Sequence, residues 1–219
     1  MTGEDVKYFK QCQRAGLVRS RMLEVGSAKV QGVDNLCDIA RQLGVSDTTG
    51  ADIEAHNGVD LVFDFGLPRD VFERQWDAGK FSTVCIFSVL EHTFDPLTVL
   101  ANALSCVDSG GSLIVSTPAI WPIHCFPRDY CRLLPDWYVA FAEQNNVTLD
   151  KQHFCWLSEF GIEPVRTDPT NQFPSFQTRG RAASTYRYWT SRIAHMWLNT
   201  YGRSHWAANS AIGATFIRP

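Results

Sequence analysis

The sequence predicts an α/β fold, in which helices cover both faces of a doubly wound, mostly parallel sheet of seven strands. Two observations support this prediction. Apolar, β-branched runs alternate with segments of helical periodicity between residues 20 and 117, which is typical of parallel strands connected by helices. A polar residue also ends four of the apolar runs, at the sheet edge where such folds bind ligands. These residues are Glu24, Asp52, Asp64 and Ser88.

The first part of the chain is expected to supply three strands. An amphipathic helix over residues 3–15 precedes the first strand at residues 21–25. That strand breaks at Gly26, where the missing Cβ lets a ligand approach the main chain closely. Apolar residues then recur at helical spacing over residues 33–43. The second and third strands are expected at residues 48–53 and 59–65.

The next part supplies two more strands. A short helix is expected over residues 68–76. Residues 81–88 form a nearly continuous apolar run, which suits an inner strand covered on both faces. Asp95 and Pro96 are typical of a helix start, as an N-cap and a first-turn proline. A glycine pair at 110–111 is expected to stop this helix, and residues 113–116 to form the fifth strand.

Beyond residue 118 the pattern is less regular. Residues 119–135 are rich in proline, histidine and aromatic residues and predict a loop. The remaining expectations are a helix at 136–145, a strand at 154–157, a loop at 167–178, a helix at 182–201 and a strand at 211–217.

Length and composition fit one domain. The 219 residues are 45% hydrophobic, which is enough for a core. We expect residues 1–135 to form the ligand-binding core and residues 136–219 to shape the rest of the pocket. No apolar run is long enough to cross a bilayer, and the acidic N-terminus does not fit a signal peptide, so a cytoplasmic location is expected. The seven cysteines form no C-x-x-C pair, so buried thiols are expected and no metal site is predicted.

The charge is distributed unevenly. No acidic residue follows Asp168, whereas six arginines do, so the last 51 residues carry about +6 and the first 168 about −9. Aromatic residues are interleaved with these arginines. The favoured interpretation is pairing with the acidic part of the chain, or an interface between copies in a homo-oligomer. Binding of an anionic small molecule is the next alternative. Nucleic acid is less favoured, because the whole protein is acidic. The arginines are Arg179, Arg181, Arg187, Arg192, Arg203 and Arg218.

Several short segments together resemble the motifs of class I S-adenosylmethionine-dependent methyltransferases, across roughly residues 20–135. Residues 23–28, Leu-Glu-Val-Gly-Ser-Ala, resemble the first motif, in which an acidic residue precedes the glycine turn by two positions. Residues 50–53 and 62–65 resemble the second and third strand motifs. The most specific match is Ser-Val-Leu-Glu-His at 88–92, with Asp95-Pro96 after it. The resemblance implies a Rossmann-like methyltransferase fold with S-adenosylmethionine as cofactor.

The resemblance also implies roles for the residues at the strand ends. An acidic residue near the first turn suits a cofactor that carries a sulfonium and an ammonium group. The resemblance would place Glu24, Gly26 and Ser27 beside the methionine part of the cofactor and Ser88 beside the sulfonium. It would place Asp52 and Ile53 beside the ribose, and Asp64 and Phe65 beside the adenine.

The turn departs from the family pattern at two positions. Ala28 and Val30 occupy sites where the family usually has further glycines. This departure leaves open a catalytically silent homologue that acts as a binding or scaffold subunit. A dinucleotide is the main rival ligand, but its pyrophosphate would require three closely spaced glycines and would be repelled by Glu24. The turn therefore fits a cationic cofactor better.

The acceptor side is expected to follow the fifth strand. Residues 119–132 resemble a segment of methyltransferases of glycan and small-molecule biosynthesis, which implies a hydroxyl of a sugar or related metabolite as acceptor. Methyl transfer requires that the two partners are positioned in line, and a hydroxyl acceptor also has to lose a proton. His124 is the first candidate base and His92 the second, with a structural role for each as the alternative. Candidate substrate-binding residues are Trp121, Asp129, Tyr130 and Arg132, of which Asp129 and Arg132 could instead pair with each other.

Overall fold

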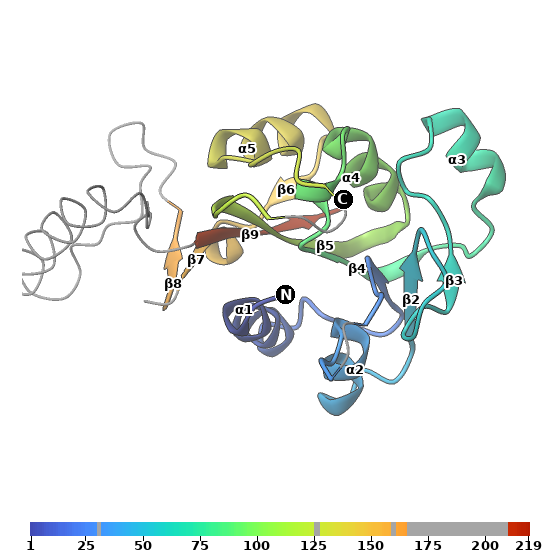
Figure 1. Cartoon of the computed structure of the whole chain (residues 1–219), viewed down its shortest axis with the longest axis horizontal. Coiled ribbons are helices and arrows are strands. Elements are labelled where there is room, and N and C mark those ends of the chain that lie inside the picture. The colour runs from blue at the N-terminus through green and yellow to red at the C-terminus, as the bar shows by residue number, and fades with distance from the viewer. Residues whose placement is uncertain (30–31, 125–127, 159–160, 166–209) are drawn as a thin grey trace, which may run out of the picture.

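The computed structural model describes residues 1–29, 32–124, 128–158, 161–165 and 210–219. Within these residues nine strands form one sheet in the order β3-β2-β1-β4-β5-β9-β7-β8, and β6 pairs with β9 beside this path (Figure 1). The strands from β3 to β5 are parallel, whereas β6 to β9 pair in antiparallel fashion. The strands are β1 (Met22–Val25), β2 (Thr48–Asp52), β3 (Leu61–Val62), β4 (Phe81–Phe87), β5 (Val107–Ile120), β6 (Thr148–Leu149), β7 (Cys155–Ser158), β8 (Gly161–Pro164) and β9 (Ser210–Ile217).

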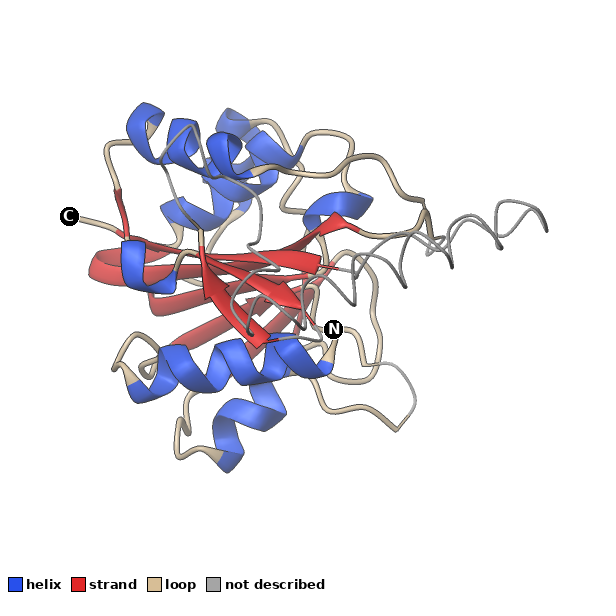
Figure 2. Cartoon of the chain, turned by 90° about the vertical axis from the view of Figure 1, so that its left-hand side faces the viewer, coloured by secondary structure: helices blue, strands red, loops and turns tan. Residues whose placement is uncertain are grey.

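Helices cover both faces of the sheet, as the sequence predicts. Two of them, α1 and α2, lie on one face, and α3, α4 and α5 lie on the other (Figure 2). Each face has its own hydrophobic cluster: Phe9 and Leu36 belong to one, and Phe72 and Leu100 to the other. The helices are α1 (Gly3–Arg14), α2 (Leu36–Gln42), α3 (Arg69–Gln75), α4 (Pro96–Ser105) and α5 (Pro135–Gln144), with short 3-10 helices η1 (Leu90–His92) and η2 (Lys151–His153).

Strand alternation explains why the inner strands are apolar throughout. In β4, Val84 and Ile86 face one cluster, whereas Cys85 and Phe87 face the other. The direction of strand order reverses between β1 and β4, because β1 continues to β2 on one side and β4 to β5 on the other. This reversal places the carboxyl ends of β1 and β4 side by side, at the position where doubly wound sheets bind ligands.

The helix starts follow from local sequence. In α1, the side chain of Thr2 accepts a hydrogen bond from the N–H of Asp5, and the Asp5 carboxylate accepts one from the N–H of Thr2. In α4, the Asp95 carboxylate accepts the N–H of Thr98 at 3.1 Å, and Pro96 occupies the first turn. The prediction that Asp95 and Pro96 open this helix is confirmed.

Four details differ from the prediction. The third strand, predicted at residues 59–65, is limited to Leu61–Val62, because it is an edge strand that pairs with β2 at only two positions. The sheet has nine strands instead of seven, because β6 has only two residues and β8 contains a glycine and a proline, which are uncommon in strands. Helix α4 ends at Ser105, before the glycine pair. The pair lies inside β5, where Gly110 has φ of +70° and a Cβ on Gly111 would lie 2.7 Å from Val107. The glycines thus allow an irregular start of the strand.

Some expectations concern segments outside the described residues. The loop at 167–178, the helix at 182–201 and all the tail arginines except Arg218 lie outside the described residues. The expected division near residue 135 stays a prediction. Across the part of the chain that the structure describes, no helix combines the length and apolar character that a membrane span requires.

Candidate functional site

The turn after β1 is bound to β2 and packed against the segment after β4. The N–H groups of Gly26 and Ser27 both donate to the carbonyl of Ala51, at 2.8 and 3.1 Å. Gly26 has φ of +84°, and a Cβ added there would lie 2.2 Å from Cγ2 of Val89. Glycine at this position therefore allows the residues after β4 to lie directly on the turn.

Glu24 anchors a helix beside this turn. Its side chain is buried, and its two oxygens accept the N–H groups of Leu36 at 3.0 Å and Cys37 at 2.8 Å, in the first turn of α2. Burial raises the pKa of Glu24 to about 7, although these hydrogen bonds oppose the shift. The carboxylate thus positions α2, and its expected contact with the cofactor stays a prediction.

The end of β2 presents a carboxylate and an apolar side chain. Asp52 accepts the N–H of Ile53 at 2.8 Å and the N–H of Ala28 at 3.1 Å, so it lies directly beside the Gly26 turn. The side chain of Ile53 is 63% exposed. In the same turn Ser27 is fully buried, and its hydroxyl has no hydrogen-bond partner among the described residues. These groups have the chemistry to contact a polar nucleoside.

The residues after β3 and β4 differ in exposure. Asp64 accepts the N–H of Gly66 at 2.7 Å. Phe65 is only 4% exposed and packs among aromatic rings that include Phe72. Ile53 therefore offers more apolar surface to a ligand than Phe65 does. Ser88 has φ of +54°, which non-glycine residues seldom adopt and which is common near functional sites.

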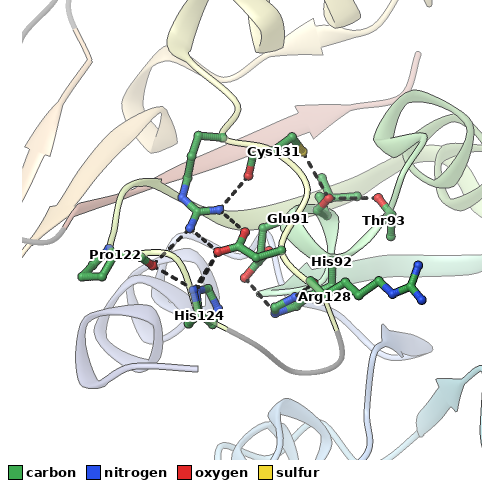
Figure 3. A network of polar contacts seen from close by, with 10 residues as sticks. Glu91, His92, Thr93, Pro122, His124, Arg128 and Cys131 are labelled. Carbon is green, nitrogen blue, oxygen red and sulfur yellow. Dashed lines mark hydrogen bonds and ion pairs between the residues drawn. The ribbon is translucent and has the colours of Figure 1, made fainter.

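A second polar group follows β4 and β5 (Figure 3). Glu91 and His92 belong to η1, and His124 follows the end of β5. Glu91 is completely buried, and neither of its oxygens has a hydrogen-bond partner among the described residues. Burial raises the pKa of Glu91 to about 7. The ring centroids of His92 and His124 are 5.0 Å apart, so both expected bases lie in one cluster.

The loop after β5 is held by an ion pair. The Arg132 guanidinium bonds both oxygens of Asp129 and holds the pKa of that carboxyl well below its usual range. Asp129 in turn accepts the N–H of His124 at 2.9 Å. The alternative that Asp129 and Arg132 pair with each other is therefore confirmed. Their binding of substrate stays a prediction, as does that of the half-buried Trp121.

Tyr130 lies on the outside of this loop. It is 44% exposed, and its ring packs edge-on against Phe94, with centroids 5.8 Å apart. Its N–H donates to the carbonyl of Glu91 at 2.8 Å, which ties the loop to η1.

Glu91 is the residue of this cluster that the sequence did not single out as a functional residue. It lies in the most specific of the motifs, beside His92. A carboxylate four residues after the end of the buried strand β4, next to a histidine, is the signal that could have identified it.

The cysteines that the structure describes are free thiols, as expected. Five of the six are buried, and Cys131 is half-buried. Cys125 lies outside the described residues.

Comparisons with known proteins agree with this arrangement. A family model described as "Methyltransferase domain" matches residues 6–164. A search of curated proteins finds no match. Among solved structures, a Bacillus halodurans C-125 protein matches with a TM-score of 0.55 at 11% identity, covering 99% of this chain and 100% of the other.

Two further structures have similar scores. A SAM-dependent methyltransferase from Archaeoglobus fulgidus has a TM-score of 0.53 at 11% identity, covering 99% of this chain and 95% of the other. Magnesium protoporphyrin IX methyltransferase from Synechocystis PCC 6803, with bound SAM, has a TM-score of 0.50 at 12% identity, covering 99% and 78%. At such identities these structures establish the fold.

Proposed function

Because this chain belongs to the methyltransferase domain family, we propose that it transfers a methyl group to a hydroxyl of a small molecule, such as a sugar or related metabolite. S-adenosylmethionine is its cofactor, and the hydroxyl acceptor is the new part of the proposal. One observation supports it above the others. Val89 packs on the Gly26 turn, and the cluster of Glu91 and His92 begins two residues later. Groups able to act on an acceptor are thus adjacent to the cofactor turn.

On the cofactor side, each polar group has a task that suits its position. When bound, S-adenosylmethionine supplies a methyl group on a positively charged sulfur. We assign Asp52 to the ribose hydroxyls, because its carboxylate accepts hydrogen bonds at the end of β2. Ile53 offers an apolar surface to the adenine, and Asp64 an acceptor for its amino group. Ser27 and Ser88 line the methionine end of the site.

On the acceptor side, the two histidines are the groups that can accept the proton of the acceptor hydroxyl. A hydroxyl is a poor nucleophile until its proton is removed, and a neutral imidazole nitrogen serves this purpose near neutral pH. His124 is the first candidate, because its side chain is 36% exposed, against 17% for His92. The aromatic faces of Trp121 and Tyr130 are suited to packing on a sugar ring.

The acceptor is tested by following the methyl group into a product. The purified chain is incubated with methyl-labelled S-adenosylmethionine and a small-molecule extract, and the labelled product is identified by mass spectrometry and NMR. We expect a methyl ether on a small molecule. A label found on nitrogen, on carbon or on a macromolecule would contradict the proposal.

The cofactor contact is tested by calorimetry with S-adenosylmethionine and its demethylated product. We expect Asp52→Ala to weaken binding about 10- to 100-fold, because hydrogen bonds to a charged group are lost. Asp70→Ala is the control, since Asp70 lies on α3 in an exposed pair with Arg74. Equal affinity of the two variants would refute the ribose contact.

A further inference from the structure

Three side chains of metal-binding type converge after β4 and β5. A single ligand atom from each of Glu91, His92 and His124 can be chosen so that all three lie within 4.8 Å of one another. Nε2 of His92 is 3.7 Å from Oε1 of Glu91 (Figure 3). Two atoms bound to one zinc-sized cation lie between about 3 and 4 Å apart, depending on the angle at the metal. The cluster is thus somewhat wider than a metal site, and a pair at the 4.8 Å limit has to close by about 1–2 Å to bind one cation.

The hydrogen bonds of both histidines leave the same nitrogen free. Nδ1 of His92 is 2.6 Å from the carbonyl of Arg128, and because a carbonyl only accepts, Nδ1 carries the hydrogen and donates it. Nδ1 of His124 lies 3.3 Å from the carbonyl of Pro122 and 3.2 Å from Oδ2 of Asp129, which are also acceptors. Nε2 of each neutral ring therefore keeps its lone pair. Metal-binding histidines are oriented by this kind of bond to a carbonyl or carboxylate.

The third group is a carboxylate that, in the described part of the chain, accepts no hydrogen bond and has His92 as its nearest basic group. Glu91 is 0% exposed, and both its oxygens are without a hydrogen bond in the part of the chain that the structure describes. Arg132, the nearby cation, is bonded through its two terminal nitrogens to Asp129 and to the carbonyls of Pro122 and Cys131, whereas its Nε has no hydrogen-bond partner among the described residues. A buried anion is costly unless a cation or hydrogen-bond donors offset its charge.

From this geometry we infer that Glu91, His92 and His124 bind a divalent transition-metal cation of the zinc type. Two imidazole nitrogens and one carboxylate suit zinc, iron, cobalt or nickel, whereas magnesium and calcium prefer oxygen ligands alone. Three protein ligands also leave at least one coordination position open. The sequence does not predict this site, because His124 is distant in the chain from Glu91 and His92.

The open position suggests a role. A bound cation would lower the pKa of an acceptor hydroxyl, and the proton would then pass to solvent water. With the metal bound, His92 and His124 would serve as ligands, and without it they are the candidate bases of the proposed function. This role rests on the proposed function. Metal binding itself does not, because it needs neither S-adenosylmethionine nor an acceptor.

The test measures metal binding alone. Untagged protein is freed of metal with a chelator and titrated with Co²⁺, whose visible absorption reports nitrogen and oxygen ligands, and Zn²⁺ affinity is measured against a coloured chelator. We expect one cation per chain. His124→Ala and Glu91→Gln should each weaken binding at least about 100-fold, because losing a ligand costs more than losing an outer partner. His124 is partly exposed, so its replacement should leave the fold intact.

His56→Ala is the matched control, because His56 is an exposed histidine that forms no part of the cluster. The affinity of the His56→Ala variant for Co²⁺ and Zn²⁺ should equal that of the wild type. Absence of Co²⁺ binding, or equal binding by His124→Ala and wild type, would overturn the metal site. Co²⁺ binding without an O-methylated product would refute the acceptor proposal and support the site. Full methyl transfer to a hydroxyl by a protein that binds no metal would support the acceptor proposal and overturn the metal site.

Discussion

The contact between Gly26 and Val89 can be tested through stability. An alanine at residue 26 has to adopt φ of +84°, and its Cβ would lie 2.2 Å from Cγ2 of Val89. The left-handed backbone costs a residue with a Cβ about 1–2 kcal/mol, and overpacking adds roughly 1–3 kcal/mol. We expect Gly26→Ala to lower the free energy of unfolding by about 2–5 kcal/mol, measured by urea denaturation.

Two sets of variants separate these contributions. Gly16→Ala and Gly44→Ala are the controls, because these glycines have φ of +75° and +88° but nothing within 4 Å of an added Cβ. They should show the backbone cost alone. Val89→Ala removes the clashing methyl group, so the double variant Gly26→Ala/Val89→Ala should lose about 1–3 kcal/mol less than the sum of the single variants. If Gly26→Ala costs no more than the controls, or if the two changes are additive, the packing argument is wrong.

Two further predictions concern buried carboxylates. Burial raises the pKa of Glu24 from 4.5 to about 7, so within this range the folded protein holds a proton that the unfolded chain releases. The free energy of unfolding should therefore fall by roughly 3 kcal/mol as the pH rises through this range, and Glu24→Gln should remove that part of the dependence in urea denaturation at about pH 5 and about pH 7.5. Equal slopes for the two proteins would contradict the assignment. Asp5 accepts the hydroxyl of Ser116 at 2.6 Å and also caps α1, so Asp5→Ala should lower the free energy of unfolding by about 2–3 kcal/mol, whereas Asp70→Ala should have little effect.

Much of the fold could be predicted because its signals are local. The apolar run of β4 and the Asp95-Pro96 start of α4 each depend on a few neighbouring residues. Strand β6 has two residues and is defined by its pairing with β9, which is distant in sequence, whereas β8 begins with a glycine and ends with a proline, residues that seldom predict a strand. The irregular start of β5 likewise depends on its register with Phe81.

The candidate site also has one part that local sequence predicts and another part that depends on the fold. The position of Asp52 at a strand end follows from the strand pattern. The partners of Glu24 do not, because its carboxylate reaches the first turn of α2. The convergence of His124 on Glu91 and His92 depends on where β5 ends and how the Asp129 and Arg132 pair holds the following loop. Sequence patterns identify such residues one at a time, and only the fold brings them together.

Strand β9 affects how this sheet can assemble. It lies between β5 and β7, and Ser112 pairs with Ile217, so the middle of the sheet joins residues far apart in the chain. Such distant pairings slow folding, and until residues 210–217 have emerged from the ribosome β5 and β7 each expose an unpaired edge. A nascent chain is therefore open to edge-to-edge association until these residues have emerged. A chain that stops before residue 210 would keep the parallel strands but lose the strand that connects them to β7 and β8.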